Sequence, residues 1–371
     1  MIVSAPDHNQ IEISVIGPGY GESILIHIGS GRWIVIDSCI NSHDKSPAAP
    51  SYLTTLGLDP AECVHLIVTT HWHDDHIRGL SALVRACKSA KFCLAAALTT
   101  QEFLETLASY DEAHGLVSGS GASEIMSTLQ IVRDEGRRAA RVVADTRLYQ
   151  CPGTDLAHGQ SCEIWGLSPS AKQFDLSLRA IGNLMPQPTE AKRRAPEQGR
   201  NDLSIAAWIS IGDLAILLGA DLEERNDPEL GWTAIISSSS RPPGKASFFK
   251  IPHHGSFNGH CGAVWDDLLV SRPTTVLTPW NRGRGLPLQS DIERIRSHSD
   301  AAFATTTFKA NPVRRRVPAV EKQLREVGVK IKSDVLRTGH VRLRNGGTKN
   351  ANTWCVEMLE GSCHLDTLIA A

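Results

Sequence analysis

Apolar and polar residues alternate along the first part of the chain. This two-residue period, interrupted by glycine turns, predicts three strands, "IEISVIG" (11–17), "SILIHIG" (23–29) and "RWIVIDS" (32–38). The segment "SYLTTLGLDP" (51–60) predicts a helix that ends near Gly57, and "HLIVTT" (65–70) predicts a short buried strand. The chain therefore opens as a sheet with helical connections.

The rest of the chain mixes both patterns. Residues 99–141 predict helix throughout, and 288–299, "LQSDIERIRSHS", predicts another helix. Strands are predicted at "SCEIWGLSP" (161–169), "SIAAWISIG" (204–212), "LAILLGA" (214–220), "ASFFKIP" (246–252), "TTVLTPW" (274–280), "AAFATTTF" (301–308) and "GHVRLR" (339–344). The tail segment "WCVEMLEG" (354–361) fits a strand or a short helix. No domain-sized linker interrupts the elements, so we expect one α/β domain built on two sheets.

Composition adds limits on location and partners. The 371 residues are 41% hydrophobic and 21% charged, which is typical of a globular protein with a full core. The net charge of −2 does not by itself require a polyanionic partner. No apolar run approaches the ~18 residues of a membrane helix, and the start lacks the pattern of a secretion signal. The nine cysteines form no C-x-x-C pair, so we expect reduced thiols in a cytoplasmic protein.

Polar residues of metal-binding types are concentrated in "HWHDDH" (71–76), directly after a predicted strand. If the strand continues, His71 and His73 point to the same side and can hold one ion. Asp75 and His76 lie where the chain turns and can reach a second ion. A solvated polar loop is the alternative, but the density of ligand types at the end of a strand favours a metal site.

Two other strand ends carry similar residues. Asp221 follows "LAILLGA", where a buried carboxylate is costly unless it binds a cation or a donor; its alternative role is to cap a following helix. His253 and His254 follow "ASFFKIP". One of these histidines could complete the second metal site, and the other could donate to a substrate oxygen.

The motifs together resemble the metallo-β-lactamase superfamily, whose mark is H-x-H-x-D-H. Within it the chain is most similar to the hydrolase domain of ComEC-type DNA-uptake proteins, through "VIGPGYGESILI", "WIVIDS", "RNDLSIAAW", "LLGADLE", "IPHHGS", "FATTTF" and "GHVRLR". The resemblance implies an αββα four-layer sandwich of two mixed sheets flanked by helices. It implies a hydrolase domain over residues 1–345, with a helical insertion at about 99–141 and a basic insertion at about 309–333. Residues 346–371 would form a C-terminal extension.

The resemblance also implies roles for single residues. His71 and His73 would hold the first metal, Asp75, His76 and His254 the second, and Asp221 would bridge both. Asp37 would orient a ligand, and Asp75 and His253 are the candidate catalytic residues, His253 as proton donor. Asn201 stands where many members have a third histidine for the first metal, and Asn201 and Asp37 would either support the ligands or act as further ligands themselves. Three nitrogen ligands fit Zn²⁺, whereas a more oxygen-rich site admits Mn²⁺.

We therefore expect a nuclease that cuts phosphodiesters of DNA or RNA with a metal-activated water. Arg193, Arg194 and Arg200 precede Asn201, and with the basic stretch 309–333 they could bind phosphates, although a charge run is often only a solvated face. The helical segment 99–141 offers a surface for a protein partner. The alternatives are a hydrolase of a small ester, lactone, thioester or cyclic nucleotide, and a binding module with a vestigial site.

Overall fold

The computed structural model describes residues 4–114, 121–184, 200–307, 323, 338–346 and 353–368. Their strands form two sheets of eight strands each. The strand order in the first sheet is β15 (Cys355–Leu359), β14 (Gly339–Asn345), β1 (Ile11–Gly17), β2 (Ser23–His27), β3 (Trp33–Ile36), β4 (Val64–Thr69), β5 (Lys91–Ala95) and β6 (Ala139–Val142). The order in the second is β16 (Cys363–His364), β13 (Ala302–Ala304), β12 (Leu269–Leu277), β11 (Ala246–Lys250), β10 (Leu214–Leu218), β9 (Ala207–Ile211), β8 (Cys162–Gly166) and β7 (Thr146–Cys151).

Each sheet changes from antiparallel to parallel pairing across its width. In the first sheet β1 pairs antiparallel with β14 and β2, whereas β3, β4, β5 and β6 pair in parallel. In the second, β7 to β10 pair antiparallel, whereas β10, β11, β12 and β13 pair in parallel. Parallel strands in a sheet end at the same edge, and the loops at the carboxyl ends of such strands are where α/β proteins place ligands.

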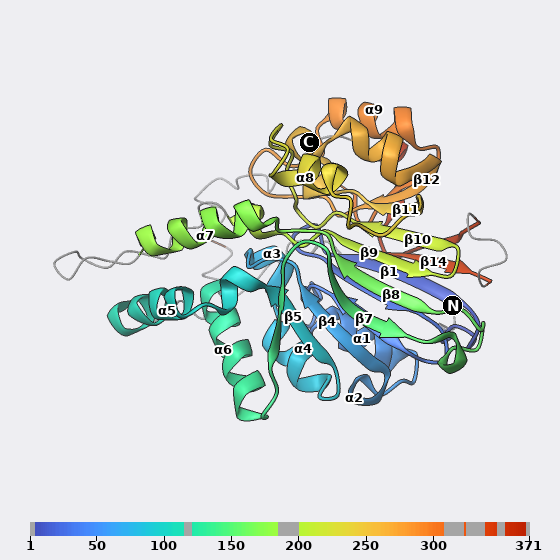
Figure 1. Cartoon of the computed structure of the whole chain (residues 1–371). Coiled ribbons are helices and arrows are strands. Elements are labelled where there is room, and N and C mark those ends of the chain that lie inside the picture. The colour runs from blue at the N-terminus through green and yellow to red at the C-terminus, as the bar shows by residue number, and fades with distance from the viewer. Residues whose placement is uncertain are drawn as a thin grey trace.

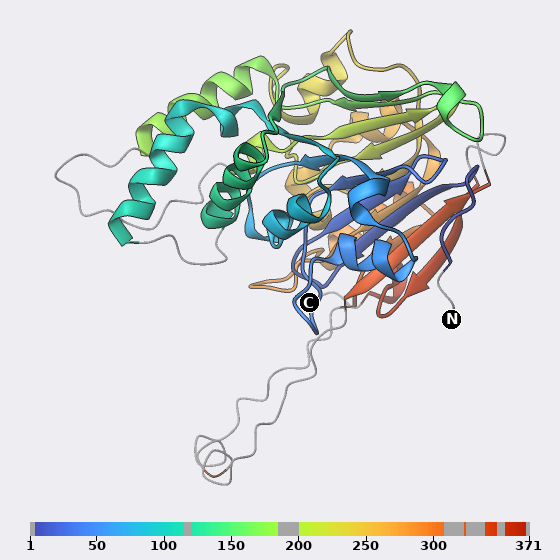
Figure 2. The same cartoon turned by 90° about the horizontal axis from the view of Figure 1, so that it is seen from below.

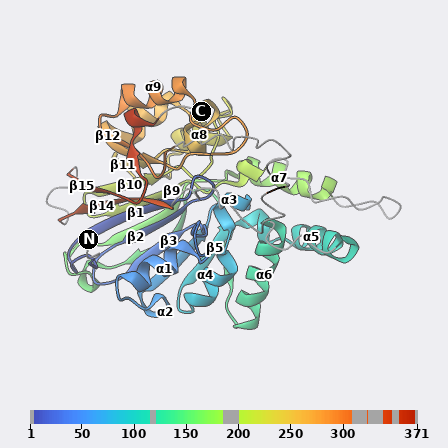
Figure 3. The ribbon, with the colours of Figure 1, turned by 180° about the vertical axis from the view of Figure 1, so that it is seen from behind.

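Helices cover the two sides of this pair of sheets. One side carries α1 (Ala48–Thr55), α2 (Pro60–Cys63), α4 (Leu80–Ala86) and α6 (Gly121–Asp134), and the other carries α8 (Gly231–Ser237) and α9 (Gln289–His298), as Figures 1 and 3 show. Two longer helices, α5 (Gln101–His114) and α7 (Ala171–Leu184), pack against each other beside the sheets. The short α3 (Asp74–Ile77) follows β4. The predicted four-layer sandwich is confirmed.

The core explains why the central strands are continuous apolar runs. Leu66, Ile67 and Val68 are consecutive in β4, so they face both sides of the sheet, and all three are completely buried. Ile216 and Leu217 of β10 are buried in the same way. A strand covered by helices on one face and by a second sheet on the other must be apolar on both faces.

One predicted helix is too long. Within the stretch 99–141, α5 and α6 are helical, but α6 ends at Asp134 and residues 139–142 form strand β6, parallel to β5. Gly136 has φ +67°, and Arg137 N donates to a carbonyl of the last helical turn, which closes the helix. The Arg137 guanidinium then binds backbone carbonyls near the end of α4. A short apolar segment that gains a sheet edge by this turn becomes a strand.

The C-terminal residues complete both sheets. β15 pairs with β14, and β16 pairs with β13, so the tail adds an edge strand to each sheet. Figure 2 shows β14 and β15, in red, beside the blue N-terminal strands. The segment 354–361, for which the sequence admits strand or helix, is therefore largely strand. The basic stretch 309–333 lies almost entirely outside the described residues. Among those described, no helix is long and apolar enough to cross a membrane.

Candidate metal centre

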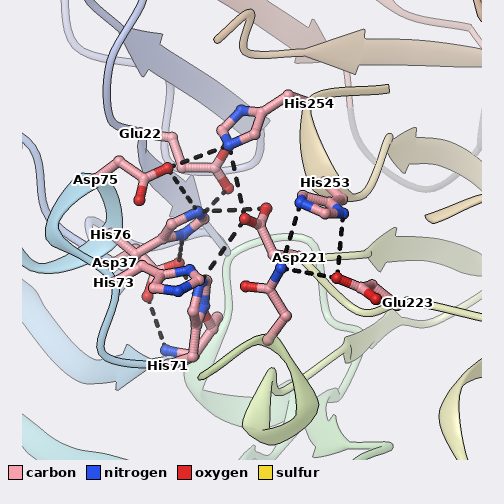
Figure 4. A network of polar contacts seen from close by, with 12 residues as sticks. Glu22, Asp37, His71, His73, Asp75, His76, Asp221, Glu223, His253 and His254 are labelled. Atoms are coloured by element: carbon pink, nitrogen blue, oxygen red, sulfur yellow. Dashed lines mark hydrogen bonds and ion pairs between the residues drawn. The ribbon is translucent and has the colours of Figure 1, made fainter. Parts of the chain in front are cut away.

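Four strand ends from the two sheets converge on one cluster of buried side chains (Figure 4). Asp37 follows β3, and the segment 71–76 follows β4 in the first sheet. Asp221 follows β10, and His254 follows β11 in the second. The residues are far apart in the chain and are brought together because all four strands run parallel to a neighbour and end at the same edge.

The described residues contain three overlapping groups with ligand geometry; two of them share Asp221, and the third is Glu22, Asp37 and His76. In each group, one potential ligand atom per residue lies within 4.8 Å of the others. The first group is His71, His73 and Asp221, and the second is Asp75, His76, Asp221 and His254. Asp221 belongs to both groups, which is the position that a carboxylate bridging two cations would take. The residues of these two groups are the ones that the sequence predicts as ligands.

The first group centres on two imidazoles. His71 Nε2 lies 3.1 Å from His73 Nδ1 and 3.8 Å from Asp221 Oδ2. His71 and His73 do not extend strand β4, as the alternation of side chains had suggested, because β4 ends at Thr69. The backbone N–H of Thr70 donates to Asp37 instead, at 2.7 Å, which directs the chain out of the sheet. The two imidazoles still meet, in the loop between β4 and α3.

The second group is assembled around two carboxylates. His76 Nε2 lies 3.3 Å from Asp221 Oδ1 and 3.5 Å from Asp75 Oδ2. His254 Nε2 lies 3.1 Å from Asp75 Oδ2 and 3.6 Å from Asp221 Oδ2. The geometry thus places His254, rather than its neighbour His253, among the ligand atoms, in line with the sequence-based preference.

Hydrogen bonds fix the orientation of three of these imidazoles. His76 Nδ1 donates to Asp37 Oδ2 at 2.7 Å, and His254 Nδ1 donates to the carbonyl of Thr278 at 2.9 Å. The Thr70 hydroxyl donates to Asp37 and can accept from His71 Nδ1, which lies 3.0 Å away. With the proton held on Nδ1, each Nε2 turns its lone pair toward the cluster. This is how partners of ligand histidines commonly select the tautomer that binds metal.

The donor set fits cations. Among the described residues, His76 Nε2, Asp75 Oδ2 and Asp221 Oδ1 are buried without a hydrogen-bond partner. Buried polar atoms of this kind are rare unless a ligand, ion or water satisfies them. Imidazole nitrogen and carboxylate oxygen are ligands of zinc, and the oxygen share also admits manganese. The cluster therefore has the chemistry of a dinuclear metal site.

The charges within the cluster perturb its titration. Burial opposes the charge on His76, but Asp221 and the other facing carboxylates outweigh it and raise its pKa well above the usual value. Burial likewise opposes the charge on Asp221, but His76 and His254 hold its pKa well below the usual value. Burial together with the neighbouring His76 lowers the pKa of His71 well below its usual range. In the protein without metal, protons on imidazoles thus offset the carboxylate charge that cations would otherwise offset.

The backbone around the cluster is strained at several points. His253 and His254 both have positive φ values, +47° and +55°, and Asp37 has +58°. Such conformations cost energy in residues other than glycine and concentrate at functional sites. Gly21, with φ +113°, lies so close to the backbone carbonyl of Asp75 that an added Cβ would be 2.9 Å from its oxygen. A glycine is therefore required where the N-terminal turn meets the ligand loop.

His253 lies at the edge of the cluster, outside both ligand groups. Its Nε2 lies 3.2 Å from Asn201 Nδ2, and its Nδ1 lies 3.6 Å from Glu223 Oε1. Asn201 Nδ2 also donates to Glu223 at 2.9 Å, while Asn201 Oδ1 makes no hydrogen bond among the described residues. Asn201 thus supports His253 in the structure, and its role as a metal ligand stays a prediction. Glu223 was missed by the sequence analysis.

A second missed feature is a buried ion pair behind the cluster. Lys250 Nζ lies 2.6 Å from Glu22 Oε2, and both side chains are at most 1% exposed. The hydroxyl of Thr278 also donates to Glu22, whose other oxygen lies 3.8 Å from His76 Nδ1. A signal for this pair existed in the sequence, since a lysine inside an apolar strand needs a buried partner. That the partner is Glu22, in the N-terminal part of the chain, does not follow from the local pattern.

The tryptophan inside the motif and the predicted phosphate contacts have different surroundings. Trp72, inside the motif, is 5% exposed and packs edge-on against Phe103, so it belongs to the core and cannot stack on a substrate. Arg193 and Arg194 lie outside the described residues, and so does the side chain of Arg200. Their proposed phosphate contacts stay predictions.

A pocket opens on the cluster. It has a volume of about 310 Å³ and is lined by Tyr20, His73, Asp74, Asp75, Asp221, His253, His254, Trp280 and Leu286. A volume of this size suits a small ligand or a small part of a larger one. His253 thus reaches the space in which a substrate would meet the ligand residues.

Sequence comparison identifies the segment that carries the motif. Residues 16–125 match the model of a family described as the metallo-beta-lactamase superfamily. This segment is therefore similar to the metallo-beta-lactamase superfamily. The match includes Asp37 and the residues 71–76, and the remaining ligand candidates Asp221 and His254 lie beyond it. No curated protein matches the chain.

Solved structures of the superfamily are similar to the chain at low sequence identity. The metallo-beta-lactamase fold protein YhfI from Bacillus subtilis is 12% identical, with 79% of this chain and 95% of that chain covered and a TM-score of 0.38. A putative metallo-beta-lactamase from Thermotoga maritima is 13% identical, with 56% and 68% covered and a TM-score of 0.29. A metallo-beta-lactamase variant from Cronobacter sakazakii is 12% identical, with 67% and 79% covered and a TM-score of 0.33.

Proposed function

We propose that this protein is a metal-dependent phosphodiesterase that acts on nucleic acid. The observation that carries the proposal is the shared place of Asp221 in two adjacent ligand groups. A pair of adjacent cations suits phosphoryl transfer, in which the attacking and leaving oxygens are both stabilised. The resemblance of "VIGPGYGES", "LLGADLE" and "IPHHGS" to ComEC-type hydrolase domains also supports nucleic acid as the substrate class.

The buried histidines and aspartates of the cluster would have two roles, to hold two cations and to orient the ligands. His71, His73 and Asp221 would hold one cation, and Asp75, His76, His254 and Asp221 the other. Two such cations would supply an activated water and offset charge on the phosphoryl oxygens. Asp37 and Thr278 would keep the ligand histidines in the binding tautomer.

His253 is the proposed proton donor to the leaving oxygen. It lines the pocket beside the ligand residues, and Glu223 faces its Nδ1 at 3.6 Å. In the structure its Nε2 faces the amide nitrogen of Asn201, which can only donate to it, so the substrate oxygen would replace that amide and Nε2 would first take up the proton released by the attacking water. A donor placed in this way typically contributes 10²- to 10⁴-fold to the rate.

A hydrolase of a small ester, lactone or thioester is the second candidate. The observation in its favour is the pocket itself, which at about 310 Å³ encloses a small molecule and has an aromatic and aliphatic wall of Tyr20, Trp280 and Leu286. A nucleic acid would have to enter it with a single nucleotide.

The decisive experiment combines metal analysis with substrate tests. Purified protein is assayed for bound metal and is then incubated with single- and double-stranded DNA, RNA, bis-(p-nitrophenyl) phosphate, a lactone and a thioester. We expect bound zinc or manganese and metal-dependent cleavage of the phosphodiesters. Cleavage of lactone or thioester alone, with nucleic acids untouched, would favour the second candidate.

Variants assign the roles. Asp75→Ala and His254→Ala should lose metal and activity together. His253→Ala should keep its metal but turn over about 10²-fold more slowly or worse. His43→Ala, at a side chain that is 80% exposed and outside the site, is the matched control. Full phosphodiesterase activity in Asp75→Ala would contradict the ligand assignment.

A further inference from the structure

One wall of the pocket is aromatic, and no ligand role accounts for it. Tyr20 and Trp280 line the pocket with ring centroids 5.0 Å apart. The Trp280 ring also lies 5.3 Å from the ring of the ligand candidate His254. Unlike Trp72, which is packed in the core, both rings are only partly buried. An aromatic surface beside a charged cluster thus stays open to the pocket.

The backbone holds Trp280 in a fixed place. It follows β12, and its N–H and carbonyl both pair with Leu286, so residues 281–285 form a closed loop beside the pocket. This loop, "NRGRG", carries the exposed arginines Arg282 and Arg284. The backbone of Trp280 is thus held in place before a ligand arrives, which lowers the entropic cost of binding.

Two guanidinium groups lie over the ring of Tyr20, next to the residues that line the pocket. Arg282 lies over the Tyr20 ring with its central carbon 3.3 Å from the centroid, and Arg78 lies over the same ring at 5.0 Å. Arg78 comes from the turn directly after α3, and Arg282 comes from the loop that follows Trp280. A guanidinium stacked on a ring keeps N–H groups at its edge, and these groups match a phosphate.

These observations point to a ligand that is aromatic at one end and anionic at the other. An aliphatic ester would use neither the stacking surface nor the arginines. A nucleotide would use both, because every base has a face that stacks on an aromatic ring and every sugar carries a phosphate. The distance from Trp280 to His254 places the stacking surface next to the ligand cluster, where the phosphate to be cut would lie.

We propose that Trp280 and Tyr20, together with Arg282, form a subsite for one nucleotide next to the phosphate that is cut. The proposal rests on the proposed function for the phosphate at the cluster. The base would stack on Trp280, and Arg282 would contact the next phosphate along the strand. Stacking does not read hydrogen-bond patterns, so the subsite would accept all bases.

Binding tests the subsite without turnover. Titration calorimetry of the zinc-loaded protein compares adenosine 5′-monophosphate with ribose 5-phosphate, which lacks only the base. We expect adenosine monophosphate to bind at least about fivefold more tightly, the lower end of what stacking of one base contributes. Equal affinity for the two ligands, or no binding of either, would overturn the proposal.

Variants connect the difference to the wall. Trp280→Ala should abolish the advantage of the nucleotide over the sugar phosphate, whereas Trp280→Phe should retain most of it because a ring remains. Phe257→Ala, at an exposed aromatic side chain outside the pocket lining, should leave it unchanged. Wild-type discrimination in Trp280→Ala would refute the role of the tryptophan.

Matched substrates separate the failure of this proposal from that of the proposed function. Thymidine 5′-(p-nitrophenyl) phosphate and methyl p-nitrophenyl phosphate have the same leaving group, and only the first carries a base. We expect a higher kcat/KM for the thymidine ester, and a loss of this preference in Trp280→Ala. Equal cleavage of both esters would reject the subsite and leave the phosphodiesterase standing. If neither ester is cut while the nucleotide still binds through Trp280, the phosphodiesterase is rejected and the subsite remains.

Discussion

Replacing Asp37 by asparagine tests how the ligand histidines are oriented. The buried carboxylate of Asp37 accepts hydrogen bonds from the N–H and the hydroxyl of Thr70 and from His76 Nδ1, all at 2.7 Å. Burial raises the pKa of Asp37, while its contact with His76 opposes that rise. Asparagine has nearly the same shape and, like aspartate, tolerates the positive φ at this position, so the backbone should not change.

The effect follows from the single oxygen of an amide. Asp37 Oδ1 accepts from the Thr70 N–H, and Oδ2 serves the Thr70 hydroxyl and His76 Nδ1. With the amide oxygen at Thr70 N–H, the NH₂ group faces His76 Nδ1, and the ring must shift its proton to Nε2. Nε2 can then no longer bind a cation. Loss of such a partner typically weakens metal binding 10- to 100-fold, which is about 1.4 to 2.7 kcal/mol.

The variant also leaves the buried hydroxyl of Thr70 without the acceptor that it has in Asp37 Oδ2. We expect the free energy of unfolding of the metal-free protein to fall by about 1–3 kcal/mol. Zinc affinity is measured by competition with a chromophoric chelator, and stability by urea denaturation in the presence of a metal chelator. Asp213→Asn, at an exposed turn, is the control for the same chemical change. Wild-type zinc affinity in Asp37→Asn, with the Asp213→Asn control also unchanged, would refute the orienting role.

Three further predictions concern the protein around the site. Lys250→Met should lower the free energy of unfolding by about 3–5 kcal/mol, because the carboxylate of Glu22 stays buried without its counter-ion. The control Lys88→Met, at an exposed lysine, should change the midpoint of urea denaturation little. An equally small change in Lys250→Met would contradict the ion pair. Zinc binding at pH 7 should release protons from His76 and His254. Burial lowers the pKa values of these two imidazoles in the metal-free protein, but the facing carboxylates raise them more strongly. A raised pKa keeps an imidazole protonated until the pH passes that value, so zinc affinity should increase with pH; calorimetry in two buffers of different ionisation enthalpy measures the release, and identical heats would speak against it. Zinc at about 100 times its dissociation constant should raise the free energy of unfolding by about 2.7 kcal/mol. Thermal unfolding with and without a chelator measures this effect, and an unchanged Tm would contradict a preformed metal site.

The local patterns of the sequence determined most of the elements and the ligand types. Alternation predicted β1, β2 and β3, because side-chain direction in a strand repeats every two residues wherever one strand lies. The density of ligand types in residues 71–76 predicted a metal site, because a buried imidazole or carboxylate at a strand end is costly without a partner. These signals are local, so they could be read without knowing the fold.

Local patterns gave wrong predictions where contacts with a distant part of the chain determine the local structure. The segment 139–142 is short and apolar and is a strand only because the edge of β5 is beside it. His71 and His73 lie beyond the end of β4 because Asp37, more than thirty residues earlier, binds the backbone at Thr70. A periodic pattern contains no information on where a distant side chain forms a hydrogen bond with the backbone and ends a strand.

The tertiary structure alone decided how the site is assembled. It brought His254, and not His253, into a group with ligand geometry, where the hydrogen bond to Thr278 orients the ring. It paired Glu22 with Lys250 and placed the ring of Trp280 beside the ligand cluster. These contacts join loops of two different sheets, and which loops meet depends on strand order and direction, which follow from packing of the whole chain and from no segment by itself.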